Sequence, residues 1–142
     1  GPGISARGGC GMPVETVDIY PTLAALAGLP QPGGAQPIDG VSLVPVLRDS
    51  TVRVKDHVYH CFPRNRPGQG EWIGRALRTD RHRLVEWIPF NGAGEPVLEL
   101  YDYLKDPLES ENLAATQPAV VAQLRLKLDR YPAPVRPVTR NP

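Results

Sequence analysis

The sequence has few cysteines and no long apolar segment. Its two cysteines, Cys10 and Cys61, allow at most one internal disulfide, and their spacing does not indicate a redox compartment. No apolar run approaches the roughly 20 residues that span a bilayer. Residues 1–13 also lack the apolar centre of a signal peptide. We therefore expect neither a membrane helix nor an export signal within this chain.

Short motifs of several common sites are also missing. The stretch PGGAQPIDG lacks the lysine and the strand-to-helix setting of a phosphate-binding loop, and no D-x-D-x-D loop is present for calcium. His57 and His60 would point to opposite faces of a strand. A zinc site made by these histidines and Cys61 would need further ligands, which Cys10 and His82 would supply only by coincidence of folding. We expect no metal site in this chain, and no nucleic-acid-binding module is recognisable.

The composition is that of an ordinary globular domain with segregated charge. The 142 residues are 41% apolar and 22% charged, with a net charge of +1. Eight basic and three acidic residues lie between positions 53 and 83, whereas seven acidic residues and one lysine lie between 84 and 118. Two interpretations stay open: the basic segment binds an anion, or it pairs with the acidic segment across a sheet.

The first 50 residues predict two short helices joined by loops. Residues 1–13 are rich in glycine and proline, so they predict an irregular connection. We expect another part of the protein to precede it. Asp18 as N-cap, Pro21 in the first turn and Gly28 as a stop predict the first helix. A second short helix is predicted within residues 41–49. The apolar face of the first helix would carry Ile19, Leu23 and Leu26.

From residue 57 the apolar pattern changes to a period of two, which indicates strands. Four strands are predicted, at residues 57–62, 72–79, 82–88 and 97–103. A loop is predicted at 63–71, a hairpin at Asp80 and Arg81, and a turn at 91–96.

A C-terminal helix with both a start signal and an apolar stripe is predicted after the strands. Thr116 is a suitable N-cap, and Pro118 falls in the first turn. The stripe consists of Val121, Leu124, Leu128 and Tyr131. We expect an α+β fold in which a small four-stranded antiparallel sheet is packed by this helix.

Three segments resemble the C-terminal portion of a sulfatase of the alkaline-phosphatase-like superfamily. They are PVETVDIYPTLAALAGLPQP followed by IDGVSLVPVL, then GRALRTDRHRLVEW, and then ELYDYLKDPLESENLA. Their order and spacing are similar too, and YHCFPR ahead of GRALRTDRHRLVEWIPFN most resembles the iduronate-2-sulfatase branch. The resemblance implies three parts: residues 1–50 end the larger α/β catalytic domain at its edge, 51–133 form a C-terminal subdomain, and 134–142 form a proline-rich tail.

The resemblance also bears on Cys61 in the stretch CFPRNR. Sulfatases convert the cysteine of C-x-P-x-R into a formylglycine nucleophile, but the position that needs arginine is Asn65 here. Cys61 also closes a predicted strand, whereas such a nucleophile belongs at a helix N-terminus. In the family the nucleophile and the calcium ligands lie far upstream. We therefore expect no catalytic residue and no bound cofactor in this chain, with calcium and formylglycine in the missing N-terminal half.

The resemblance implies that the whole enzyme hydrolyses sulfate esters of a sulfated sugar or glycosaminoglycan. It also implies that this chain forms one wall of the substrate cleft. We expect Arg64 and Arg66, on a loop between strands, to bind sulfate or carboxylate groups, because guanidinium groups pair bidentately with both. His60 would add a hydrogen bond and Trp72 a face for sugar stacking. Alternatively, Arg64 is a buried partner of an acidic residue, and Trp72 belongs to the hydrophobic core, so that neither residue binds substrate.

The expected partners are the N-terminal catalytic half of the same sulfatase and a sulfated sugar, with neither nucleic acid nor membrane. Sulfatases of this type are exported, to the periplasm or outside the cell, or are lysosomal. Two other classes stay open. One is a phosphoester or phosphonate hydrolase of the same superfamily, with an upstream threonine or serine nucleophile. The other is a noncatalytic module that binds anionic glycans.

Overall fold

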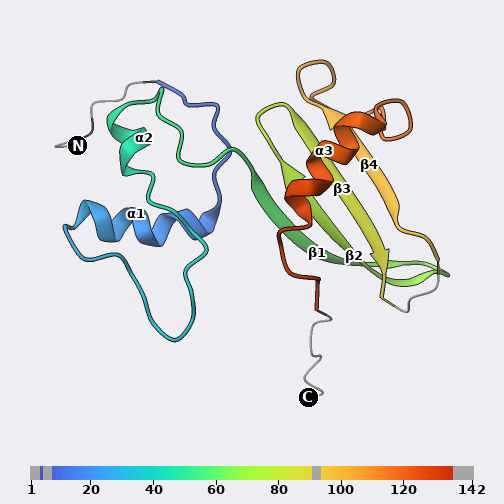
Figure 1. Cartoon of the computed structure of the whole chain (residues 1–142), viewed down its shortest axis with the longest axis horizontal. Helices are drawn as coiled ribbons and strands as arrows, with labels where there is room; N and C mark the ends of the chain where they lie inside the picture. The colour runs from blue at the N-terminus through green and yellow to red at the C-terminus, as the bar shows by residue number, and fades with distance from the viewer. Residues whose placement is uncertain (1–3, 5–7, 91–93, 136–142) are drawn as a thin grey trace. The chain divides into compact units, whose positions relative to one another are not determined.

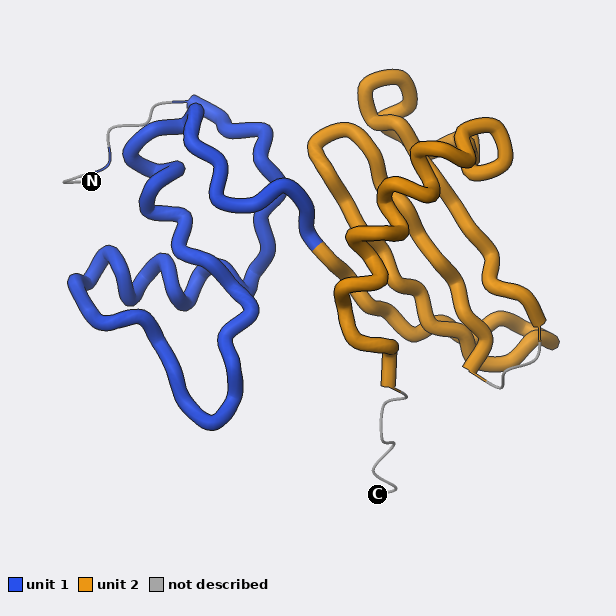
Figure 2. The backbone as a smooth tube through the Cα atoms, in the orientation of Figure 1, with its two compact units in different colours: residues 1–58 blue, residues 59–142 orange. Residues whose placement is uncertain are grey.

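The computed structural model describes residues 4, 8–90 and 94–135 (Figure 1). The chain divides into two compact units, residues 1–58, called the helical unit, and residues 59–142, called the sheet unit (Figure 2). Residues 91–93 of the predicted turn, and most of the predicted tail, lie outside the described residues.

The helical unit contains three short helical segments. A 3-10 helix, Thr16–Asp18 (η1), leads into α1, Ile19–Leu26, and α2 spans Val44–Arg48. α1 ends just before Gly28, whose φ of +68° is a left-handed conformation that favours glycine. The predicted first helix and its stop signal are therefore confirmed.

A fully buried carboxylate, that of Asp18, joins three segments of the helical unit. It accepts hydrogen bonds from the main-chain N–H groups of Glu15 (2.8 Å) and Val41 (3.0 Å). Both of its oxygens also accept from Lys55 Nζ, at 2.8 and 2.7 Å. Burial opposes ionisation of Asp18, but these hydrogen bonds outweigh it and hold its pKa below the usual value. Asp18 precedes α1 as predicted, yet its side chain makes no capping bond to that helix.

α1 turns its small residues inward. Pro21, Thr22 and Ala24 are buried in the unit. The predicted apolar face exists, but Ile19, Leu23 and Leu26 lie on the exposed side of the helix.

The sheet unit is a four-stranded antiparallel sheet with one helix across a face (Figure 1). The strands follow one another in space in the order of the sequence. They are Val58–Arg66 (β1), Gly70–Arg78 (β2), His82–Pro89 (β3) and Val97–Asp102 (β4), and the helix is Pro118–Leu128 (α3). Leu84 on β3 pairs with Leu77 on β2 and with Leu100 on β4. The predicted α+β fold is confirmed.

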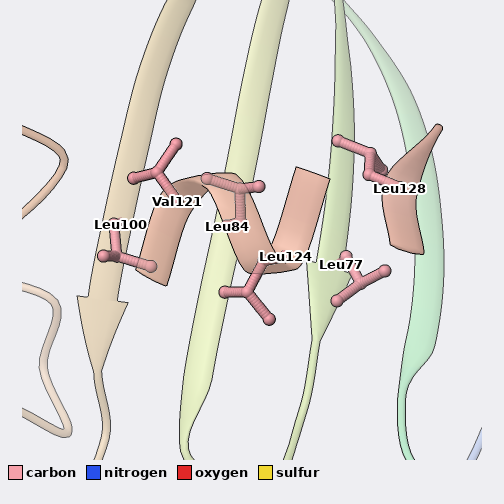
Figure 3. Packing of buried hydrophobic residues seen from close by; sticks show 6 residues of the cluster. All are labelled: Leu77, Leu84, Leu100, Val121, Leu124 and Leu128. Carbon is pink, nitrogen blue, oxygen red and sulfur yellow. The ribbon is translucent and has the colours of Figure 1, made fainter. Parts of the chain in front are cut away.

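The core of the sheet unit lies between the sheet and α3 (Figure 3). Each of β2, β3 and β4 contributes one fully buried leucine, and α3 contributes its predicted stripe. The core residues are Leu77, Leu84, Leu100, Val121, Leu124 and Leu128. Beyond the helix, Tyr131 stacks on Tyr59 of β1 with ring centroids 4.1 Å apart.

β1 extends further than the sequence predicted. The prolines and glycines of residues 63–71 predicted a loop, but β1 continues to Arg66 and β2 begins at Gly70 after a three-residue turn. Pro63 is tolerated because β1 is the first strand of the sheet, and an edge position can lack an N–H donor. Arg64 and Arg66 therefore lie on a strand, and their predicted placement in a loop is wrong.

The outer edge of β4 is covered by the chain that follows it. The Asn112 side chain accepts a hydrogen bond from Leu100 N and donates one to the Leu98 carbonyl, each at 3.0 Å. Leu113 N then donates to the Leu100 carbonyl at 2.8 Å. These bonds replace those that a fifth strand would make.

Asp102, fully buried at the end of β4, ties the β2–β3 hairpin to β4. Nε and Nη2 of Arg81, in the hairpin, donate to its two oxygens at 3.0 and 2.8 Å. Leu104 N donates to the same carboxylate at 3.2 Å. The hydrogen bonds from Arg81 lower the pKa of Asp102 from the usual 3.8 to about 2.

We expect acid to destabilise the sheet unit in part through Asp102. Because the pKa is lower in the folded than in the unfolded chain, ionisation stabilises the fold fully above about pH 4, and this contribution is lost as the pH falls toward about 2. Asp102→Asn should flatten this part of the pH dependence of the urea midpoint, followed by the fluorescence of Trp72 and Trp87. Glu95→Gln, at an exposed position, is the control. An Asp102→Asn protein as acid-sensitive as its parent would contradict this role.

Candidate anion-binding face of the sheet

The face of the sheet opposite α3 carries arginines stacked on indole rings. Side chains alternate along a strand, so Trp72 on β2 and Trp87 on β3 point away from the face that holds the leucine core. Arg64 and Arg66 of β1 lie over these rings. We call this surface, made by Arg64, Arg66, Trp72 and Trp87, the arginine face.

The guanidinium groups are fixed by contacts between cations and aromatic rings. Arg66 Cζ lies 4.4 Å from the ring centroid of Trp72 and 5.5 Å from that of Trp87. Arg64 Cζ lies 5.6 Å from the centroid of Trp87. Such contacts contribute about 0.5–1 kcal/mol each at exposed sites. A stacked guanidinium group keeps the N–H donors at its edges available for an anion.

A glycine makes room for Trp87. Gly74 pairs with Trp87 across β2 and β3, and a Cβ at this position would lie 2.7 Å from a ring carbon of that indole. The ring therefore lies directly over the β2 backbone. Sequence reasoning missed Trp87, although its period-two spacing from Val85 was a signal that pointed to this face.

The charges of the sheet are paired selectively. Three arginines bind acids, in the pairs Arg75–Glu86, Arg81–Asp102 and Arg83–Glu109. Arg64 and Arg66 form no ion pair with any residue that the structure describes. The interpretation of pairing across a sheet thus holds for Arg75, whose partner Glu86 lies on the neighbouring strand, whereas Glu109, the partner of Arg83, lies in the loop after β4. Within the described residues, no acid compensates the charge of Arg64 or Arg66.

The four predicted substrate-binding residues fall on one face. His60 shares the alternation of Arg64 and Arg66 along β1, and the arginines overlie Trp72. His60 and Arg64 are exposed. Trp72 is only 7% exposed and its ring is covered by Arg66, so direct stacking of a sugar on this ring requires Arg66 to move.

Both indole N–H groups under the arginines lack a partner. Nε1 of Trp72 and Nε1 of Trp87 are buried and make no hydrogen bond within the described residues. Buried polar groups are normally satisfied, so each exception calls for an explanation. The two indole N–H groups of the arginine face are such exceptions.

The two cysteines are not joined by a disulfide. Cys10 and Cys61 are free, exposed thiols. Cys61 lies within β1, not at the start of a helix. The described ranges bring together no group of three or more His, Cys, Asp or Glu able to hold a metal ion. In the same ranges, every helix is too short or too polar to cross a membrane.

The sheet unit has the fold of a small α+β domain. Comparison with known proteins shows that this chain is similar to the C-terminal region of sulfatases. The family described as N-sulphoglucosamine sulphohydrolase, C-terminal, matches residues 4–133, and the chain belongs to this family. The resemblance to the C-terminal portion of a sulfatase is thereby confirmed.

Individual relatives are sulfatases of bacteria and animals. Arylsulfatase K of Danio rerio is 33% identical over 129 residues, which are 87% of this chain and 23% of the relative. Delta 4,5-hexuronate-2-O-sulfatase of Bacteroides thetaiotaomicron is 34% identical over 121 residues, 82% of this chain and 23% of the relative. The chain thus spans less than a quarter of the length of these relatives.

Two solved structures share the fold. BT1596, a 2-O glycosaminoglycan sulfatase, superposes with a TM-score of 0.58 and 33% identity over 80% of this chain and 23% of its own. BT4656, in complex with its substrate D-glucosamine-2-N,6-O-disulfate, gives a TM-score of 0.62 and 25% identity over 80% of this chain and 22% of its own.

Proposed function

We propose that this chain is the C-terminal part of a sulfatase that hydrolyses sulfate esters of a sulfated sugar or glycosaminoglycan. The observation that carries the proposal is the family match over residues 4–133. The names of the relatives support the substrate class, because they include a hexuronate sulfatase and a glycosaminoglycan sulfatase.

Within the whole enzyme, the arginine face forms one wall of the substrate cleft. Arg64 and Arg66 present donors whose charge no acid of the described chain neutralises, and such donors suit a sulfate or a uronic carboxylate. His60, exposed on the same strand, adds a hydrogen bond, and Trp72 supports Arg66 from below.

The partner of this chain is the upstream catalytic half of the same sulfatase. That half holds the formylglycine and the calcium ion, which together supply the nucleophile and the stabilisation of developing negative charge. The residues of this chain bind and orient the sugar. We place the whole enzyme among the exported or lysosomal sulfatases.

The test is sulfatase activity on a chromogenic aryl sulfate and on sulfated disaccharides. The chain is assayed alone and again after mixing with a protein that carries the upstream half. We expect activity only in the mixture. Activity of the chain alone would instead implicate Cys61, and a mixture that cleaves the matching phosphate ester but not the sulfate would identify a phosphoester hydrolase.

A further inference from the structure

The indole ring of Trp87 lies under both arginines of the arginine face. The centroid of its ring is 5.6 Å from Arg64 Cζ and 5.5 Å from Arg66 Cζ. The two arginines differ in their other support. Arg66 also overlies Trp72, at 4.4 Å, whereas Arg64 overlies no second ring in the described part of the chain. Loss of the Trp87 ring would therefore release Arg64 but leave Arg66 on Trp72.

Trp87 contributes the face of its ring and not its N–H group. A buried indole N–H usually finds a hydrogen-bond acceptor, but that of Trp87 has none among the described residues. The ring lies flat over the β2 backbone because Gly74 has no side chain there. Replacing Trp87 by an apolar residue thus breaks no hydrogen bond of the described chain.

A third arginine on the same face shows a different kind of support. Arg83 Cζ lies 5.3 Å from the ring centroid of Tyr101, but its guanidinium group also donates to the Glu109 carboxylate. An acid therefore neutralises Arg83. Arg64 and Arg66 are held by rings without an acid of the described chain, so that both the edge N–H donors and the charge are left for a ligand.

Holding a long side chain in place before a ligand arrives strengthens binding. A free arginine loses rotamer freedom when it binds an anion, and a side chain that is already ordered loses less. Arg64 and Arg66 are two residues apart on β1, which places their Cα atoms about 7 Å apart on one face. One ring thus orders two neighbouring positive charges.

We propose that Trp87 is a positioning residue, which holds Arg64 and Arg66 for anionic groups of the substrate other than the sulfate that is hydrolysed. The inference rests on the proposed function, in which the upstream half carries the nucleophile and therefore receives the hydrolysed sulfate. The two charges of the arginine face remain for further sulfate or carboxylate groups. The whole enzyme then selects sugars with several anionic groups over a simple aryl sulfate.

The experiment compares two substrates of the whole sulfatase, which is this chain joined to its upstream part. One is a disulfated disaccharide that contains a uronic acid, and the other is a chromogenic aryl sulfate without a second anionic group. Trp87→Leu should lower kcat/KM for the disaccharide by about 10-fold, mainly through KM, because two contacts between cations and a ring are lost. For the aryl sulfate the change should stay below about 2-fold. Trp87→Phe keeps a ring face and should remain within about 3-fold of the parent on both substrates.

The unequal support of the two arginines gives a second readout. Arg64→Ala should lower kcat/KM for the disaccharide by about 10-fold in the parent, but by less than about 3-fold further in Trp87→Leu, where Arg64 is already released. Arg66→Ala should keep most of its effect in both backgrounds, because Trp72 still supports Arg66.

Three results would overturn the positioning role. They are an equal loss on both substrates, which indicates a structural defect, unchanged kinetics in folded Trp87→Leu, and full additivity of Arg64→Ala with Trp87→Leu. Gly74→Ala provides the same test if Trp87→Leu does not fold. It keeps the indole but displaces the ring, since the new Cβ would lie 2.7 Å from a ring carbon, and it should show the same loss on the disaccharide alone.

The parent enzyme separates this inference from the proposed function. A parent that hydrolyses both sulfate esters, with variants that match it, would refute the positioning role and leave the function standing. A parent that hydrolyses neither would refute the function. Calorimetric titration with the disaccharide then still tests the positioning role, because Trp87→Leu should raise its Kd by about 10-fold and Trp87→Phe by no more than about 3-fold.

Discussion

Replacing Glu86 by glutamine should lower the free energy of unfolding of the sheet unit by about 3–5 kcal/mol. Glu86 on β3 is 2% exposed and accepts from Arg75 Nε at 3.0 Å, from Arg75 Nη2, and from Arg125 Nη2 at 3.0 Å. Arg75 is itself only 8% exposed. Glu86→Gln would therefore replace a charged acceptor by a neutral one and leave the buried guanidinium group with Asp129, at 3.3 Å, as its anionic partner among the described residues.

Urea unfolding followed by tryptophan fluorescence measures this loss, because both tryptophans, Trp72 and Trp87, lie in the sheet unit. Asp129→Asn is the matched control, since it removes a charge from the same network at a side chain that is 55% exposed. Its cost should stay below about 1 kcal/mol, as for exposed ion pairs generally.

A double replacement separates the cost of an orphaned charge from the value of the ion pair. Arg75→Met combined with Glu86→Leu removes both charges and keeps apolar volume between the sheet and α3. Stability should then return to about the parent value or exceed it by about 1–4 kcal/mol. A double variant as unstable as Glu86→Gln would show that the pair itself stabilises the fold.

In the whole sulfatase, Arg64→Ala combined with Arg66→Ala should lower kcat/KM for a sulfated disaccharide by about 100-fold or more. Each hydrogen bond to a charged group contributes about 1.5–3 kcal/mol, and both guanidinium groups lack another anion within the described chain. Because these side chains bind the sugar and do not carry the nucleophile, the loss should fall mainly on KM.

Two further variants make that result specific. Arg64→Lys with Arg66→Lys keeps the charge but loses the bidentate geometry, so its kcat/KM should lie between those of the parent and the alanine variant. Arg130→Ala removes an exposed arginine just after α3 and should change neither constant. Unchanged kinetics in a folded double-alanine variant would remove the arginine face from the substrate cleft.

Alternation and helix spacing were sufficient to predict the sheet unit. Four strands, the Asp80–Arg81 hairpin and the buried stripe of α3 follow from the sequence because each element has one face in a single core. The end of β1 did not follow, because Pro63 and the glycines beyond it normally interrupt a strand. Only the edge position of β1 makes that proline acceptable, and the order of strands is a property of the whole sheet.

The candidate site was predicted in composition but not in geometry. Arg64, Arg66 and Trp72 were identified by residue type, whereas their stacking with Trp87 depends on the register that pairs Gly74 with that indole. The orientation of α1 was equally out of reach. Helical spacing predicts which residues share a face, but the buried bonds of Asp18 and Thr22 decide which face turns inward.

The two edges of the sheet also bear on how the protein behaves at high concentration. The Asn112 segment already occupies the Leu98–Leu100 part of the β4 edge, which disfavours addition of a strand from a second molecule there. At the β1 edge, Pro63 and the charges of Arg64 and Arg66 discourage strand addition. We therefore expect these arginines to act as gatekeepers against aggregation, so that the side chains we propose to bind a sulfated sugar would also disfavour association through the β1 edge.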